Sequence, residues 1–251
     1  MKTGIQVSSF RPVLTTEAEV QTAFERMSAM GCRYVQLQWI DPRVKITDIA
    51  SAAKENGIES VSVQDFFVEV LRNMPYYTRL NTLTGGTWVC VSRIPPEFRS
   101  REGLERYIGI LRDKNRSLES IGQKLCFHPV SSDFQPIEGL DPVEYLLDHM
   151  PELEICADLY HLHKSGKNIA HWLERYRGRV PMVHFKDYRL RSDRQEELVP
   201  AGQGVIDWTG VVEACLDTGV QYAFVEQERW EGDPFDRLEE ALVWLNDQLP
   251  E

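Results

Sequence analysis

The sequence predicts an α/β protein with a (β/α)8 barrel fold, formed as a single domain over residues 1–251. Short β-rich segments alternate with amphipathic helical segments along the whole chain, without a linker or low-complexity stretch. The β-rich segments are nearly continuous apolar runs, as expected for strands covered on both faces. An open doubly wound sheet is the alternative. It is disfavoured because the first strand is followed by VSSFRP and not by a glycine-rich phosphate loop.

Eight segments are expected to form the strands: residues 4–10, 33–40, 58–67, 87–94, 124–130, 153–160, 180–187 and 222–229. Between them, the apolar spacing predicts helices within residues 16–31, 45–57, 101–122 and 207–219. Three of these helical segments end in Gly31, Gly57 and Gly219. Glycine is the residue that most readily ends a helix and turns the chain back towards a strand.

Composition narrows the class of function. The chain carries 28 Lys and Arg against 39 Asp and Glu, a formal net charge of −11, which argues against a nucleic-acid partner. No segment approaches the ~20 apolar residues of a membrane span, and the N-terminal segment does not read as a signal peptide. The five cysteines are scattered and form no C-x-x-C pair, so we expect reduced thiols in a cytoplasmic protein.

Ionisable residues gather at the ends of the last four expected strands. His128 ends the fifth strand, Asp158 the sixth, His184 the seventh and Glu226 the eighth. The carboxyl ends of barrel strands surround one mouth, so we expect these four side chains to approach one another there. Mixed carboxylate and imidazole ligation suits one divalent metal ion such as Mn²⁺, Co²⁺, Mg²⁺ or Zn²⁺.

Residues 150–230 contain several motifs in a specific order. They are D-x-x-H (Asp158, His161), H-x-K-D (His184, Lys186, Asp187), G-x-G-x-x-D-W (Gly202, Gly204, Asp207, Trp208) and E-Q-E (Glu226, Glu228). In this combination the chain resembles the xylose-isomerase-like TIM-barrel superfamily. That superfamily includes sugar phosphate isomerases and epimerases, inosose dehydratases and, more distantly, endonucleases acting on abasic sites. Over residues 1–125 mainly the alternation of strands and helices agrees.

The resemblance implies a divalent ion held by Asp158, His184, Glu226 and a residue from the fifth strand. Many relatives have a Glu at that fourth position, whereas this chain reads CFHPVSSDF, which leaves His128 or Asp133 to complete the ligand set. The second and third strands also differ, because they carry Gln36, Gln38 and Gln64 where relatives have an acid or a histidine.

The chemistry implied is proton abstraction next to a metal-bound carbonyl of a sugar, sugar phosphate or keto-sugar, giving isomerisation or epimerisation. We expect Glu226 to act as ligand and base, with Lys186 or His161 protonating the oxygen. Lys186 as a simple counter-charge and His161 as a partner of a ligand are the alternatives. Asp187 is expected to be structural.

Two further functions remain as alternatives: an inosose or sugar dehydratase, and a sugar-binding barrel without activity. An abasic-site endonuclease is disfavoured by the negative charge. The expected partner is a small sugar or polyol, and a homo-oligomer is compatible with the sequence. Residues 188–197 are expected to form a charged, solvated loop. A contact of Arg189 or Arg191 with a substrate phosphate is the alternative.

Overall fold

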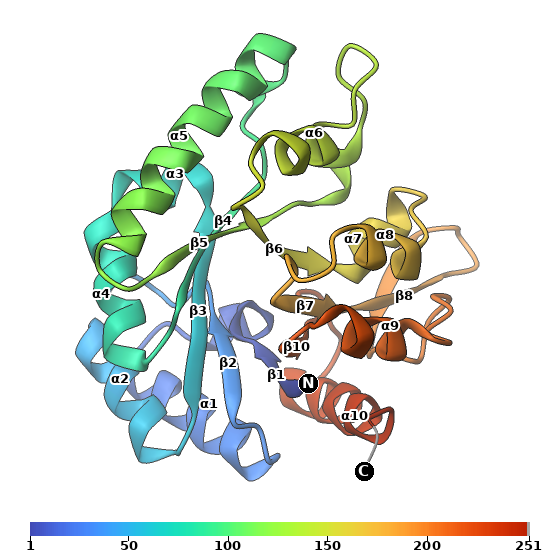
Figure 1. The fold of residues 1–251 in the computed structure, drawn as a ribbon. Coiled ribbons are helices and arrows are strands. Elements are labelled where there is room, and N and C mark those ends of the chain that lie inside the picture. Colours follow the sequence, from blue (N-terminus) through green and yellow to red (C-terminus); the bar gives the residue numbers. More distant parts are fainter. Residues whose placement is uncertain (250–251) are drawn as a thin grey trace.

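The structure is a computed structural model in which residues 1–249 are described, and it confirms the (β/α)8 barrel (Figure 1). Eight parallel strands close in the order β1-β10-β7-β6-β5-β4-β3-β2. The barrel strands are β1 (Lys2–Gln6), β2 (Tyr34–Leu37), β3 (Glu59–Phe66), β4 (Trp88–Ser92), β5 (Lys124–His128), β6 (Glu154–Asp158), β7 (Met182–Phe185) and β10 (Tyr222–Val225). Closure pairs the first strand with the last, Ile5 lying opposite Val225. All eight expected strands are present.

Helices connect the strands and cover the outside of the barrel (Figure 1). The α-helices are α1 (Glu17–Ala29), α2 (Ile46–Glu55), α3 (Phe67–Arg72), α4 (Met74–Thr84), α5 (Arg101–Glu119), α6 (Pro142–His149), α7 (Leu159–Lys164), α8 (Ile169–Arg175), α9 (Val211–Thr218) and α10 (Pro234–Asp247). Short 3-10 helices follow three strands: η1 (Val7–Val13), η2 (Pro96–Phe98) and η3 (Ser131–Phe134). No helix within residues 1–249 has the length and apolar character needed to cross a bilayer.

Local sequence explains where the helices begin. Thr16, Ser100, Asp141 and Asp233 each precede a helix, and the side chain of each accepts a hydrogen bond from a backbone N–H of the first turn. These N-caps satisfy donors that the helix itself leaves unpaired. The apolar face of each helix then packs on the barrel, as Val20, Ala23, Phe24 and Met27 of α1 do.

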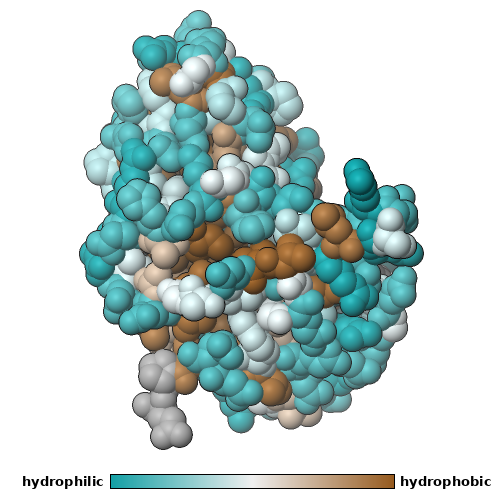
Figure 2. Space-filling model, turned by 90° about the vertical axis from the view of Figure 1, so that its right-hand side faces the viewer, coloured by the Kyte–Doolittle hydropathy of each residue, from teal (hydrophilic) through white to brown (hydrophobic). Residues whose placement is uncertain are grey.

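The core has two layers. The larger one lies between strands and helices, and the smaller one fills the barrel interior. The interior cluster consists of Val61, Trp88, Cys90, Cys126, Cys156, Met182 and Phe224. All five cysteines are buried free thiols, as expected. The barrel interior is therefore a packed core, with charged and polar side chains gathered above it at the carboxyl end. The face seen in Figure 2 is mostly hydrophilic, with a band of hydrophobic residues across it.

The expectation that residues 188–197 form a loop is wrong. These residues belong to an antiparallel hairpin of β8 (Asp187–Leu190) and β9 (Glu196–Val199), stacked beside the barrel mouth. Arg189 lies opposite Glu197, and the two form an ion pair with a nitrogen–oxygen distance of 2.9 Å. The high charge of this segment suggested a loop, but here the opposite charges are paired across two strands. Arg189 is consequently engaged within the hairpin.

Asp187 fixes the segment that returns from the hairpin to α9. Its carboxylate is fully buried and accepts hydrogen bonds from the backbone N–H groups of Gly202, Gly204 and Ile206 and from Trp208 Nε1. This confirms the expected structural role of Asp187. It also explains the glycines of the G-x-G-x-x-D-W motif, because a Cβ on Gly204 would lie 2.0 Å from Asp187 Oδ1.

We expect Gly204→Ala to lower the free energy of unfolding by roughly 1–3 kcal/mol, because the added methyl group must displace the Asp187 carboxylate. Gly109→Ala is the matched control. Gly109 lies in α5 with no atom within 4 Å of the added Cβ, so this variant should gain roughly 0.5–1 kcal/mol. Urea denaturation measures both. Equal stability of the two variants would contradict the role given to Asp187.

Candidate functional site

Strand register brings Asp158, His184 and His128 together at the barrel mouth. Asp158 of β6 lies directly opposite His184 of β7, and His128 ends the neighbouring strand β5. Asp158 Oδ2 lies 4.0 Å from both His128 Nε2 and His184 Nδ1. All three side chains are buried. One nitrogen or oxygen from each lies within 4.8 Å of the others, so the three residues form a candidate site for a metal ion.

Glu226 follows β10 and joins the same group. Its Oε2 lies 3.2 Å from His184 Nδ1, and the residue is 6% exposed. The four side chains that the sequence assigned to a metal thus point to one place at the mouth. Strand order explains the convergence, because β5, β6, β7 and β10 are consecutive neighbours in the barrel.

The far side of each histidine ring is held by a polar side chain. Ser92 Oγ lies 3.2 Å from His128 Nδ1, and Gln36 Oε1 lies 2.5 Å from His184 Nε2. Gln36 Oε1 also accepts a hydrogen bond of 2.7 Å from Gln6. An acceptor at His184 Nε2 selects the tautomer with its proton on that nitrogen, which leaves the Nδ1 lone pair available to a cation.

Each carboxylate is oriented in a comparable way. Glu226 Oε1 accepts a hydrogen bond of 2.8 Å from Ser8 Oγ, and Asp158 Oδ1 accepts one of 3.1 Å from the backbone N–H of His161. In all four residues one polar atom is therefore anchored while another faces the shared centre. Supporting contacts of this kind fix the geometry of metal ligands.

Four buried polar atoms face the centre. His128 Nε2 has no hydrogen-bond partner among the described residues, whereas Asp158 Oδ2 and Glu226 Oε2 are ion-paired with Lys186 Nζ, and His184 Nδ1 lies 3.2 Å from Glu226 Oε2. Leaving the His128 nitrogen unpaired in a protein interior is costly, unless a ligand satisfies it. Two imidazole nitrogens and two carboxylate oxygens are a suitable donor set for a divalent ion. The residues present thus fit the ion that the sequence led us to expect.

Lys186 lies among three carboxylates. Its Nζ is 3.1 Å from Asp158 Oδ2, 3.0 Å from Glu226 Oε2 and 2.9 Å from Glu228 Oε1. The lysine is 2% exposed. The surrounding carboxylates outweigh its desolvation and raise the pKa of Lys186 well above its usual value. The side chain therefore keeps its proton, an arrangement that matches the counter-charge alternative better than the role of proton donor.

The remaining ionisable groups differ in protonation. Burial, with His184 as the second cause, lowers the pKa of His128 to about 3, so its imidazole is neutral near pH 7. Burial would raise the pKa of Glu226, but Lys186 and His184 outweigh it and hold the pKa well below its usual range. Burial and then the charge of Glu226 raise the pKa of Glu228. Burial also opposes ionisation of Asp158, but Lys186 and His161 outweigh it and lower its pKa. The site therefore holds two ionised carboxylates and one, Glu228, that protonates more readily.

His161 lies beside the proposed ligands, whereas Asp133 is held by backbone groups away from the centre. His161 Nε2 lies 3.7 Å from Asp158 Oδ2, its Nδ1 has no partner among the described residues, and burial lowers its pKa to about 4. Asp133 instead accepts hydrogen bonds from the backbone N–H groups of Ile94 and Val130. Those bonds occupy both carboxylate oxygens of Asp133, whereas His128 Nε2 faces the centre.

Sequence reasoning missed the anchoring roles of Ser8, Ser92 and Gln36. Each lies at or just beyond the end of a barrel strand, the same signal that identified the four charged residues. Hydroxyl and amide groups are common at strand ends, however, so the signal was weak for them. Their contacts cross between strands that are distant in sequence, and only the closed barrel specifies those contacts.

Comparisons with known proteins agree with this architecture. A solved sugar phosphate isomerase/epimerase from Parabacteroides distasonis superimposes with a TM-score of 0.82 at 15% identity, over 98% of this chain and 94% of that one. The 3-keto-D-glucoside 4-epimerase of E. coli superimposes with a TM-score of 0.72 at 20% identity, over 98% and 99% of the two chains. At these identities the likeness establishes the fold.

An inosose dehydratase of Lacticaseibacillus casei is 24% identical over 169 residues, which is 60% of this chain. The match spans only 56% of that relative's own length. The family model described as xylose isomerase-like TIM barrel matches residues 16–248, nearly the whole chain. The chain therefore belongs to the xylose isomerase-like TIM barrel family.

Proposed function

We propose that the protein is a divalent-metal-dependent isomerase or epimerase of a sugar or keto-sugar, working by proton removal next to a carbonyl. The observation that carries the proposal is the convergence of possible ligand atoms: one each from His128, Asp158 and His184 lie within 4.8 Å of one another, and Glu226 Oε2 lies 3.2 Å from His184 Nδ1. Two imidazoles and two carboxylates meet in the buried mouth of the barrel. Such a site is suited to bind a cation and the oxygen of a substrate.

Charge supports a divalent ion in particular. The carboxylates of Asp158, Glu226 and Glu228 surround the single ammonium of Lys186, so two negative charges are left over when all are ionised. Buried like charges are unfavourable unless a cation or protons compensate them. A divalent ion held by the four proposed ligands would balance the cluster.

The chemistry such an ion supplies is polarisation of a carbonyl oxygen, which acidifies the neighbouring C–H. The protein's own groups would then move the proton. Glu226 stays ionised and is the proposed ligand and base. The Glu228 side chain is one third exposed, and its pKa is raised. This carboxyl therefore accepts and returns a proton more readily than Glu226 does. His161, neutral near pH 7, is placed to hydrogen-bond a hydroxyl.

A dehydratase is the second candidate, because the curated relative of similar sequence is an inosose dehydratase. It would share the proton abstraction and differ only in the second step, since loss of a β-hydroxyl replaces return of the proton. The proposed substrate in either case is a small sugar or polyol. A net charge of −11 supports this choice over a nucleic acid.

His184→Ala should reduce affinity for Mn²⁺ by more than about 100-fold, since removing a ligand costs more than removing a supporting contact. Metal content after incubation with Mn²⁺ and desalting measures the loss, and circular dichroism verifies the fold. His171→Ala is the control, because His171 is an exposed histidine on α8. Metal content unchanged by His184→Ala would refute the ligand assignment.

Replacing His128 and Asp133 separately distinguishes the two residues that the sequence left open. His128→Ala should weaken Mn²⁺ binding markedly. Asp133→Ala should leave the affinity nearly unchanged but lower the free energy of unfolding by roughly 1–3 kcal/mol, because the N–H groups of Ile94 and Val130 lose their acceptor. Titration calorimetry and urea denaturation provide the two measurements. If Asp133→Ala had the larger effect on metal binding, the fourth ligand would be Asp133.

Incubation in D₂O with a panel of keto-sugars and inososes tests the shared chemical step. The Mn²⁺-loaded protein should incorporate deuterium next to the carbonyl of at least one compound, and Glu226→Gln should lower that rate by 100-fold or more, on the order of a lost catalytic base. Mass spectrometry separates deuterium incorporation from loss of water, which would identify the dehydratase. No exchange into any compound by metal-loaded protein would count against the proposed function.

A further inference from the structure

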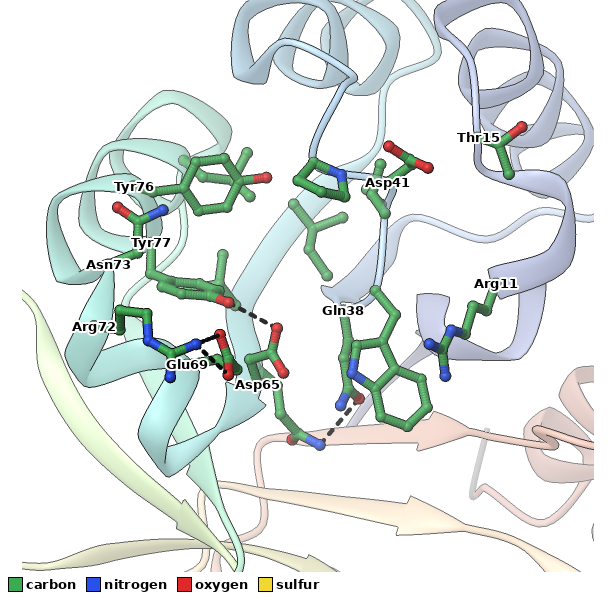
Figure 3. A pocket seen from close by; sticks show the side chains of 17 residues that line it. Arg11, Thr15, Gln38, Asp41, Asp65, Glu69, Arg72, Asn73, Tyr76 and Tyr77 are labelled. Carbon is green, nitrogen blue, oxygen red and sulfur yellow. Dashed lines mark hydrogen bonds and ion pairs between the residues drawn. The ribbon is translucent and has the colours of Figure 1, made fainter.

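A cavity of about 570 Å³ opens at the carboxyl ends of β2 and β3 (Figure 3). Its walls come from η1, the segment after β2, and helices α3 and α4. Tyr76 and Tyr77 lie on one side of the cavity and Arg11 lies on the other (Figure 3). Trp39 also lines the cavity, with its ring against the Arg11 guanidinium. The volume is within the range of small-molecule sites, roughly 300–1,000 Å³. None of the four proposed ligands lines it.

The cavity is adjacent to the proposed metal site through strand β2. Gln36 contacts His184, and Gln38, two residues further along the same chain direction, lines the cavity. Two residues of a parallel strand advance roughly 7 Å and return the side chain to the same face. Gln38 Oε1 accepts a hydrogen bond of 3.1 Å from Gln64 of β3, which also lines the cavity. Gln36 and Gln38 thus link the His184 side of the mouth to the cavity.

The lining combines aromatic rings with planar amides. Trp39, Tyr76 and Tyr77 offer flat apolar surfaces that suit the C–H face of a sugar ring. Gln64 is 3% exposed, and its Oε1 has no hydrogen-bond partner among the described residues. A buried acceptor of this kind is satisfied by a ligand hydroxyl.

The charges of the lining favour a neutral ligand. Its acidic residues are Asp41, Asp65 and Glu69, against two arginines. Arg72 is paired with Glu69 at 2.9 Å, which leaves Arg11 as the arginine of the lining without a carboxylate partner among the described residues. The Arg11 guanidinium lies over the Trp39 ring, 4.8 Å from its centroid, and extends the aromatic wall. A phosphate would enter a region with more negative than positive groups.

We infer that this cavity binds the second unit of a neutral disaccharide or glycoside, whose first ring carries the reacting carbonyl at the proposed metal site. The inference rests on the proposed function and adds the substrate class: an uncharged glycoside in place of a free monosaccharide or a sugar phosphate. Tyr76, Trp39 and Gln64 are the residues that select it.

Titration calorimetry of the Mn²⁺-loaded full chain tests this with glucose, glucose 6-phosphate, cellobiose, maltose and trehalose. At least one disaccharide should bind about tenfold more tightly than glucose and glucose 6-phosphate, the scale of one added aromatic contact. Tyr76→Ala should remove that preference, and Gln64→Leu should reduce it while nearly conserving volume. Tyr145→Ala, which removes a partly buried tyrosine on α6 outside the cavity, should leave the preference intact.

Equal affinity for glucose and every disaccharide, or tightest binding of glucose 6-phosphate, would overturn the inference. A preference that survives both Tyr76→Ala and Gln64→Leu would also overturn it. The preference should persist in metal-free His184→Ala, because the second unit does not contact the metal ligands. If the protein prefers a disaccharide but never binds a metal ion, the proposed function is refuted and this inference is not. Metal binding and deuterium exchange without the preference would refute only this inference.

Discussion

The ammonium of Lys186, enclosed by the carboxylates of Asp158, Glu226 and Glu228, is the interaction on which the barrel mouth depends. The buried carboxylates of Asp158 and Glu226 and the partly exposed one of Glu228 repel one another. Lys186 offsets one charge and holds the acids at 2.9–3.1 Å. The remaining negative charge, beside the neutral imidazole of His128, favours a cation at the mouth, as the proposed function requires.

The fold secures this cluster from several directions. The residue after Lys186 is Asp187, whose buried carboxylate gathers the backbone of residues 202–206 and the Trp208 indole. Serines from the β1 and β4 ends and Gln36 from β2 fix the outer atoms of Glu226, His128 and His184. Every part of the barrel that anchors the site is thus rigid backbone or a buried side chain, which preserves the geometry before any ligand arrives.

The mouth is divided into two chemically distinct halves. The ends of strands β5, β6, β7 and β10 supply the groups of the proposed metal site, while the amides and aromatic rings come from β3, the segment after β2 and helix α4. Gln36 belongs to both halves, since it contacts His184 and lies two residues before Gln38. Charged groups are suited to the reacting atoms, and neutral polar and aromatic groups to recognition of the rest of a sugar.

The sequence by itself determined the barrel, the strand positions and the four residues that meet at its mouth, because alternating apolar runs and strand-end charges are local patterns. It also identified Asp187 as structural. The hairpin of residues 187–199, the confinement of Asp133 to backbone donors and the support by Ser8, Ser92 and Gln36 were decided by tertiary structure. Each of these depends on a contact between residues of different strands or loops, and such contacts exist only once the sheet has closed and its register is set.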